Sequence, residues 1–149
     1  MLLKDICTPG VACCKPEVSI LEAARQMREA HVGDLVVVDD SEGDEVPLGI
    51  ITDRDIVVEV LAKELDPTKV KVRTVMRQPV VIASGSEEAS KALERMRAHG
   101  VRRVPVMGDD RKLMGIVTLD DLVRELAAGA RVIADIVSKE QAQERRQRR

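Results

Sequence analysis

The chain carries the same pattern of residues twice, and this duplication limits what it can fold into. Residues 49–55 read Gly-Ile-Ile-Thr-Asp-Arg-Asp, and residues 115–121 read Gly-Ile-Val-Thr-Leu-Asp-Asp, 66 positions later. Upstream of these segments the two halves align at an offset of 69, from Asp5 to Val38. The first copy therefore has a turn three residues longer. Because a match of this length rarely arises by chance, the chain is an internal duplication of one unit.

Each copy predicts the order strand, helix, strand, strand, helix. Apolar residues at helical spacing predict helices that begin near Ser19 and Ser86, and Ser86 is a predicted N-cap. Apolar runs separated by Gly- and Asp-rich turns predict a hairpin in each copy. The expected strands are 11–14, 34–38, 48–51, 80–83, 103–107 and 112–117, and the second helices run from 53 to about 65 and from 119 to about 128. The predicted fold class is α/β (α+β), with two β-α-β-β-α units packed about a pseudo-twofold and a cleft between them.

Composition narrows the possible functions. The chain of 149 residues has a net charge of −2, which provides no general attraction to nucleic acid or to a membrane surface. It contains no Phe, Tyr or Trp, so the core must be aliphatic and bases cannot stack on aromatic rings. The apolar runs are too short to span a bilayer, and no signal peptide is recognisable. We therefore expect a cytoplasmic protein without a nucleic-acid partner.

The cysteines favour a structural role over a metal or redox role. Cys7, Cys13 and Cys14 form no CxxC pair, and no histidine lies at ligand spacing from them. Successive side chains of a strand face opposite ways, so one of Cys13 and Cys14 should be buried and the other accessible. The sequence also contains no recognisable nucleophile–base pair, which indicates that the protein is not an enzyme and has no catalytic residues.

The repeated threonine and aspartate have two interpretations. Thr52 with Asp55, and Thr118 with Asp121, stand three positions apart where a strand passes into a helix. The threonine can cap the helix while the aspartate stabilises its first turn. Alternatively, free N–H groups at the helix start can bind a phosphate and the carboxylate can accept hydrogen bonds from ribose hydroxyls. Their position at a strand end in both copies favours ligand contact.

The repeat with its terminal Gly-h-x-Thr-x-x-Asp segment, where h is apolar, resembles the CBS domain, and two in tandem resemble a Bateman module. The resemblance covers about residues 2 to 128, and it extends to small stand-alone bacterial proteins with two repeats. It implies a regulatory module that binds AMP, ADP, ATP, NAD or S-adenosylmethionine, with AMP, ATP or NAD favoured and no resident cofactor. The residues implied are Thr52, Asp55, Thr118 and Asp121 for ribose and phosphate, Val11, Ala12, Cys13, Val80, Val81 and Ile82 for adenine, and Arg102 and Arg103 for phosphate.

The two copies differ at one place that matters for binding. The first copy has Gly33 and Asp34 where the second has Arg102 and Arg103. If the arginines neutralise phosphate, the two ends of the cleft should differ in affinity. The alternative is that one arginine is a surface charge and the other forms a salt bridge.

The chain divides into a first unit at 2–66, a linker with a lead-in strand at 67–79, a second unit at 80–130 and a tail at 131–149. Apolar residues of the tail at helical spacing predict a helix docked on the module or on a second copy, and a basic end. We expect a homodimer that senses an adenosine-containing small molecule and acts on a regulated protein still to be identified. The alternative is a dimerisation or protein-interaction module that does not depend on nucleotides.

Overall fold

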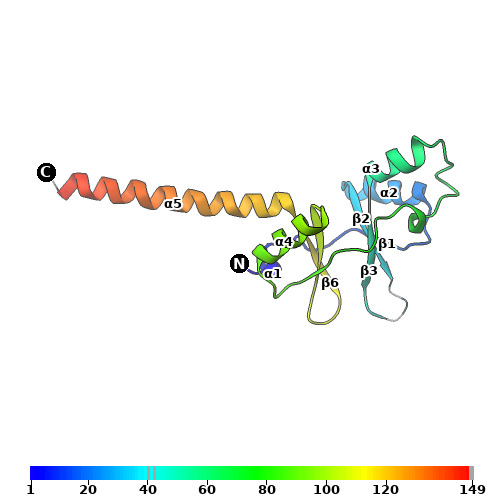
Figure 1. Cartoon of the computed structure of the whole chain (residues 1–149), viewed down its shortest axis with the longest axis horizontal. Helices are drawn as coiled ribbons and strands as arrows, with labels where there is room; N and C mark the ends of the chain where they lie inside the picture. Colours follow the sequence, from blue (N-terminus) through cyan, green and yellow to red (C-terminus); the bar gives the residue numbers. More distant parts are fainter. Residues whose placement is uncertain (40, 42, 148–149) are drawn as a thin grey trace.

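The computed structural model describes residues 1–39, 41 and 43–147. It contains two similar units and one long helix (Figure 1). In the first unit, β1 (Cys13–Cys14), β2 (Asp34–Asp39) and β3 (Val46–Thr52) form a sheet in that order, with β1 parallel and β3 antiparallel to β2. Helices α2 (Ile20–Ala30) and α3 (Asp53–Ile56), followed by the π-helical turn η1 (Val57–Leu61), complete the unit.

The second unit repeats this topology. Strands β4 (Ala83–Ser84), β5 (Arg103–Met107) and β6 (Leu113–Thr118) again lie in chain order, with β4 parallel and β6 antiparallel to β5. Its helices are α4 (Ala89–His99) and α5 (Leu119–Gln147), and short helical turns occur at α1 (Leu3–Ile6) and η2 (Val72–Thr74). The predicted duplication of a β-α-β-β-α unit is confirmed.

The core of each unit includes a segment from outside that unit's own repeat. Leu3 of α1 is fully buried in the core of the second unit, and Thr8 pairs with Ile116 of β6. In the same way Val72 lies in the core of the first unit, and Arg77 pairs with Ile50 of β3. The predicted boundaries at 2–66 and 67–79 therefore do not coincide with the two cores.

The first glycine of each repeated motif makes room for the borrowed segment. A Cβ on Gly49 would lie 2.7 Å from the carbonyl oxygen of Arg77, and a Cβ on Gly115 would lie 2.7 Å from that of Thr8. Because real Cβ atoms do not approach this closely, any larger residue would displace the backbone that crosses the strand. Gly49 and Gly115 thus allow the crossing segments to pack directly on the strands, and these contacts join the two units.

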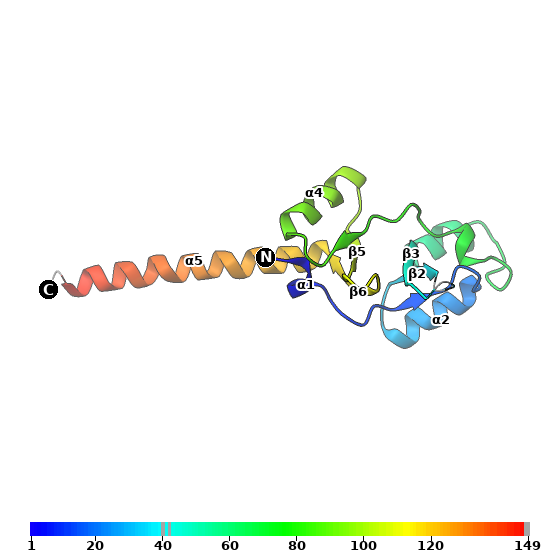
Figure 2. The same ribbon diagram turned by 90° about the horizontal axis from the view of Figure 1, so that it is seen from below.

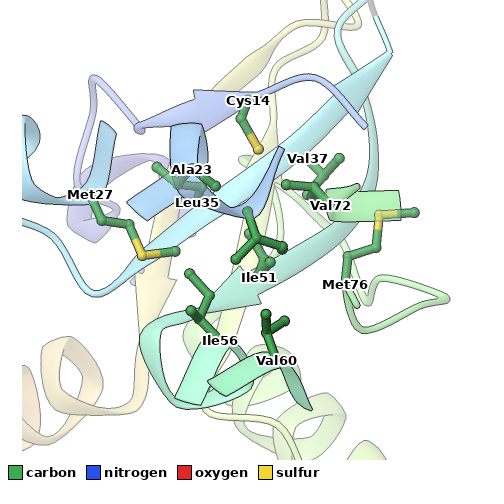
Figure 3. Close-up of a cluster of buried hydrophobic side chains, with 11 residues drawn as sticks. Cys14, Ala23, Met27, Leu35, Val37, Ile51, Ile56, Val60, Val72 and Met76 are labelled. Atoms are coloured by element: carbon green, nitrogen blue, oxygen red, sulfur yellow. The ribbon is translucent and has the colours of Figure 1, made fainter. Parts of the chain in front are cut away.

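Both cores are aliphatic, as the absence of aromatic residues requires. Figure 3 shows Val37, Ile51 and Val72 of the first core packed between the sheet and the neighbouring helical turns. Cys14 is buried in this core while Cys13 is exposed, which confirms the predicted split.

Helix starts are predicted correctly at one unit and wrongly at the other. Ser19 caps α2, since its hydroxyl accepts a hydrogen bond from the Glu22 N–H at 3.2 Å. Helix α4, however, begins at Ala89 rather than near Ser86. The Glu87 carboxylate accepts from the Ser84 N–H at 2.9 Å, and the Ser86 hydroxyl meets that of Ser84 at 2.8 Å. These bonds hold the segment in a turn.

Several element lengths also differ from expectation. The segments 11–12 and 80–82 lie outside the strand ladders, so β1 and β4 have two residues each. After Ile56 the helix of the first unit continues as a π-helical turn, in which the Ala62 N–H reaches the Val57 carbonyl at 2.9 Å. Helix α5 does not stop near 128 but runs to Gln147, because no proline interrupts it and one glycine costs only about 1 kcal/mol.

Candidate functional site

One hollow lies between the two units, where β3 ends. Its volume is about 340 Å³. The first unit contributes Thr52, Asp53 and Arg54, and the segment that leads into β4 contributes Val80 and Val81. A polar strand end thus faces an aliphatic wall from the other repeat. Cavities of this size are in the range that small molecules occupy in proteins.

Four arginines line this cavity, against a single carboxylate, that of Asp53. Arg54 lies in the first turn of α3, and Arg77 comes from the segment before the second unit. Arg103 begins β5, and Arg102 precedes it. Guanidinium groups bind phosphate through paired N–H donors. The side chains that line the cavity therefore carry more positive than negative charge.

Three of these arginines also form ion pairs. Arg77 donates to Asp55 at 3.0 Å, Arg102 lies 3.4 Å from Asp120, and Arg103 lies 3.3 Å from Asp34. Arg102 and Arg103 are thus each paired and each line the cavity, and phosphate binding by them stays a prediction. Within the part of the chain that the structure describes, the side chain of Arg54 forms no ion pair.

The pair Asp34 and Arg103 joins equivalent positions of the two repeats. The two residues are 69 positions apart, which is the offset of the duplication. They meet because the units face each other about their pseudo-twofold. Burial raises the pKa of Asp34, while the Arg103 charge opposes that rise and the Asp53 charge adds to it.

At the first motif the threonine and the aspartate form a capping box. The Asp55 N–H donates to the Thr52 hydroxyl at 3.2 Å, and the Thr52 N–H donates to Asp55 Oδ2 at 3.0 Å. Asp55 Oδ1 accepts from Arg77 Nε, and the residue is only 5% exposed. Thr52 therefore reaches the cavity, whereas both carboxylate oxygens of Asp55 are engaged within the protein.

The second motif repeats this geometry around a smaller hollow. Asp121 Oδ2 accepts from the Thr118 N–H at 2.9 Å and from its hydroxyl at 2.8 Å, and Asp121 Oδ1 lies 3.6 Å from Arg124. The hollow measures about 160 Å³ and is lined by Arg102, Arg103, Thr118, Leu119 and Asp120. The two ends of the module are therefore unequal, and the larger one lies beside Thr52.

Some of the residues predicted to bind the ligand do not line either hollow. Val11, Ala12 and Cys13 line neither of the two hollows, and nor does Ile82, whose carbonyl accepts a hydrogen bond from Arg95. The larger cavity instead pairs the first motif with Val80 and Val81. Sequence reasoning missed Arg54 and Arg77, although Arg54 stands inside the motif itself and so carried a signal.

The thiols are poorly suited to nucleophilic chemistry. Burial raises the pKa of Cys14 from its usual 9.0 to about 11, with the adjacent Cys13 adding to the rise. Burial also raises the pKa of Cys13 and of Cys7. Thiols in such surroundings stay protonated at neutral pH and react slowly. Across the described residues, no three side chains of His, Cys, Asp or Glu lie close enough together to hold a metal ion.

Comparison with known proteins agrees with this architecture. The CBS domain family matches the chain twice, over residues 3–62 and 72–128. An uncharacterised protein of Methanopyrus kandleri is 39% identical over 120 residues, which are 80% of this chain but only 60% of that relative. Hypoxic response protein 1 of Mycobacterium tuberculosis is 37% identical over 123 residues, 83% of each chain.

Solved structures show the same fold. Hypoxic Response Protein I with two coordinated zinc ions superposes with a TM-score of 0.71 at 33% identity, over 83% of this chain and 98% of that one. The CBS domain pair of protein MJ0100, in complex with 5′-methylthioadenosine and S-adenosyl-L-methionine, gives a TM-score of 0.73 at 29% identity, over 87% and 98%. With two matched repeats, two units of the same topology and these relatives, the chain belongs to the CBS-domain family as a tandem pair, a regulatory module.

Proposed function

We propose that this module senses an adenosine-containing nucleotide, which binds in the cavity beside Thr52. The observation that carries the proposal is the meeting, in one cavity, of a threonine at a strand end, an aliphatic wall and four arginines. The complex of the MJ0100 domain pair with two adenosine derivatives supports the ligand class.

The lining residues suggest how such a ligand would lie. The aliphatic side chains of Val80 and Val81 offer a surface for the adenine ring, which has no aromatic partner in this chain. The arginines then receive the phosphates. This distribution of charge favours AMP, ATP or NAD over S-adenosylmethionine, because the latter carries a sulfonium cation and no phosphate.

Binding at this position can be converted into a signal. The cavity is built from the first unit, the second unit and the segment between them, so a ligand there would contact all three. A ligand shifts a conformational equilibrium only by its difference in affinity for the two states. We expect the nucleotide to favour one arrangement of the repeats, which a partner protein then recognises, without any chemical conversion of the nucleotide.

The proposal is tested by isothermal titration calorimetry with AMP, ADP, ATP, NAD and S-adenosylmethionine. At least one phosphate-bearing ligand should bind saturably, and Arg54→Gln or Arg102→Gln should each weaken it about tenfold, as expected for a charge-assisted hydrogen bond at a partly exposed site. Arg25→Gln is the matched control, since Arg25 lies on α2 and pairs with Glu22. No heat with any ligand, or equal affinities in all three variants, would contradict the proposal.

A second candidate function is a dimerisation or interaction module that does not depend on nucleotides. The capping box favours it, because Asp55 already has partners for both oxygens and needs no ligand to satisfy it. This candidate predicts a stable dimer whose melting temperature does not change with any of the five ligands. A ligand that binds the folded state would instead raise that temperature.

A further inference from the structure

Asp53 places a carboxylate in the cavity between the two units, which lie side by side in both views (Figures 1 and 2). It is the first residue of α3, and its Oδ1 accepts a hydrogen bond from the Arg54 N–H at 2.8 Å. Within the described residues its Oδ2 accepts no hydrogen bond, and none of the four arginines of the cavity forms an ion pair with it. Because both oxygens of a carboxylate are acceptors, Asp53 offers an unused acceptor to a ligand.

The neighbouring threonine offers a donor. Thr52 lines the same cavity, and its hydroxyl oxygen accepts from the Asp55 N–H at 3.2 Å. In the second motif the Thr118 hydroxyl donates to Asp121 Oδ2 at 2.8 Å. The Thr52 hydroxyl, by contrast, donates to no atom of the described residues. A free donor and a free acceptor thus stand on consecutive residues, and a ligand hydroxyl can satisfy both because it accepts and donates.

The aspartate that ends the motif is already engaged within the protein. Asp55 is 5% exposed, and its two oxygens accept from the Thr52 N–H and from Arg77 Nε at 3.0 Å each. It lines neither of the two hollows. The second motif has Leu119 at the position of Asp53, 66 residues later. The unused carboxylate is therefore a feature of the first motif and of the larger cavity.

The surroundings of Asp53 indicate which part of a nucleotide it meets. A carboxylate repels a phosphate, whereas the arginines of the cavity attract one. The adenine ring is apolar on its faces and suits Val80 and Val81. The ribose lies between base and phosphates in every nucleotide, and its neighbouring 2′ and 3′ hydroxyls provide two donors. The ribose is thus the part of the ligand that matches an acceptor and a donor side by side.

We infer that Asp53 is the residue that recognises the ribose, with its Oδ2 accepting from the ribose hydroxyls and the Thr52 hydroxyl donating to one of them. The inference rests on the proposed function and adds the residue that distinguishes ribonucleotides from 2′-deoxyribonucleotides. Asp55 then has a different task from the one that the family resemblance implies. It holds the strand end and Arg77 in position without touching the ligand.

The first test compares AMP and ATP with 2′-deoxy-AMP and 2′-deoxy-ATP by isothermal titration calorimetry. The wild type should bind each ribonucleotide about tenfold more tightly, since the 2′-deoxy form lacks one hydrogen bond to a charged group. Asp53→Ala should abolish this preference, while the 2′-deoxy forms should bind no more weakly because a negative charge has left the cavity. The matched control is Asp109→Ala, which removes the same charge from the turn between β5 and β6 and should keep the preference.

The second test separates the two aspartates. Asp55→Asn should weaken folding but keep the preference for ribose, measured well below its melting temperature. Equal binding of both sugars by the wild type, a preference that survives Asp53→Ala, or one that Asp55→Asn abolishes would overturn the inference and leave the proposed function intact. A wild-type preference for AMP over IMP that Asp53→Ala removes would place Asp53 at the adenine amino group and would also overturn it. If neither AMP nor ATP binds, the inference fails, and if ADP and NAD also do not bind, the proposed function fails with it.

Discussion

Replacing Gly49 by alanine should loosen the module at its cavity. The new Cβ would lie 2.7 Å from the Arg77 carbonyl oxygen and 3.0 Å from the Met76 sulfur. The side chain of Met76 can move, but the backbone of Arg77 is held by two hydrogen bonds to Ile50, of 3.2 and 2.9 Å. The clash must therefore break or stretch these bonds, and Arg77 would shift away from both Asp55 and the cavity.

The size of the effect follows from these contacts. Two backbone hydrogen bonds are worth about 1–3 kcal/mol together. An overpacked methyl group adds a cost of similar size. With partial relaxation we expect the free energy of unfolding to fall by about 2–4 kcal/mol, which lowers the melting temperature by roughly 5–15 °C in a domain of this length.

Differential scanning calorimetry measures this change, since the chain has no Trp or Tyr for intrinsic fluorescence. Gly129→Ala is the control, because a Cβ there meets no atom within 4 Å and alanine is the better helix former. Its melting temperature should not fall. If Gly49→Ala melts within about 1 °C of the wild type, the close crossing of the linker over β3 does not hold the module together.

Three further predictions follow from local contacts. Ser19→Ala should lower the free energy of unfolding by about 1 kcal/mol in urea denaturation, whereas Ser86→Ala should cost less than half as much, since only Ser19 caps a helix. The free energy of unfolding should fall as the pH rises from 9 to about 11, because burial raises the pKa of Cys14 in the folded state above its value in the unfolded state. Cys14→Ala should remove part of that fall, and an identical pH profile would contradict the raised pKa of Cys14. Asp55→Asn should destabilise the protein more than Asp121→Asn in the same denaturation assay, since the Asp55 side chain is 6% exposed and that of Asp121 is 15%, and the reverse order would contradict the packing of the capping box.

The repeated pattern was sufficient to predict the topology but not how the units interlock. Periodicity in each copy reports the faces of its own helices and strands, which is why the sheets and α2 were predicted correctly. Leu3 is buried in the second core beside α4, although it lies more than 80 residues from α4 in the sequence. No local sequence pattern reports a contact of that kind. The glycine that begins each motif was the one sequence signal of this interlocking. The structure explains both glycines, because the backbones of Arg77 and Thr8 cross the strands too closely for a larger residue.

The candidate site was predicted in part for the same reason. Thr52, Val80, Val81, Arg102 and Arg103 were nominated and do line the larger cavity. The pairing of the first motif with the second unit's entry segment was not predicted, because it depends on how the units face each other. The prediction of Ser86 as a helix cap was wrong because the Glu87 carboxylate accepts a hydrogen bond from the Ser84 N–H and holds this segment in a turn.

The central claim is that a nucleotide binds in the cavity between the repeats, and methyl NMR tests it most directly. The chain should be labelled at valine methyl groups and titrated with AMP, ATP and NAD. We predict that the signals of Val80 and Val81 shift saturably with at least one nucleotide, while that of Val37, buried in the first core, changes little. Unchanged Val80 and Val81 signals at millimolar nucleotide would contradict the account.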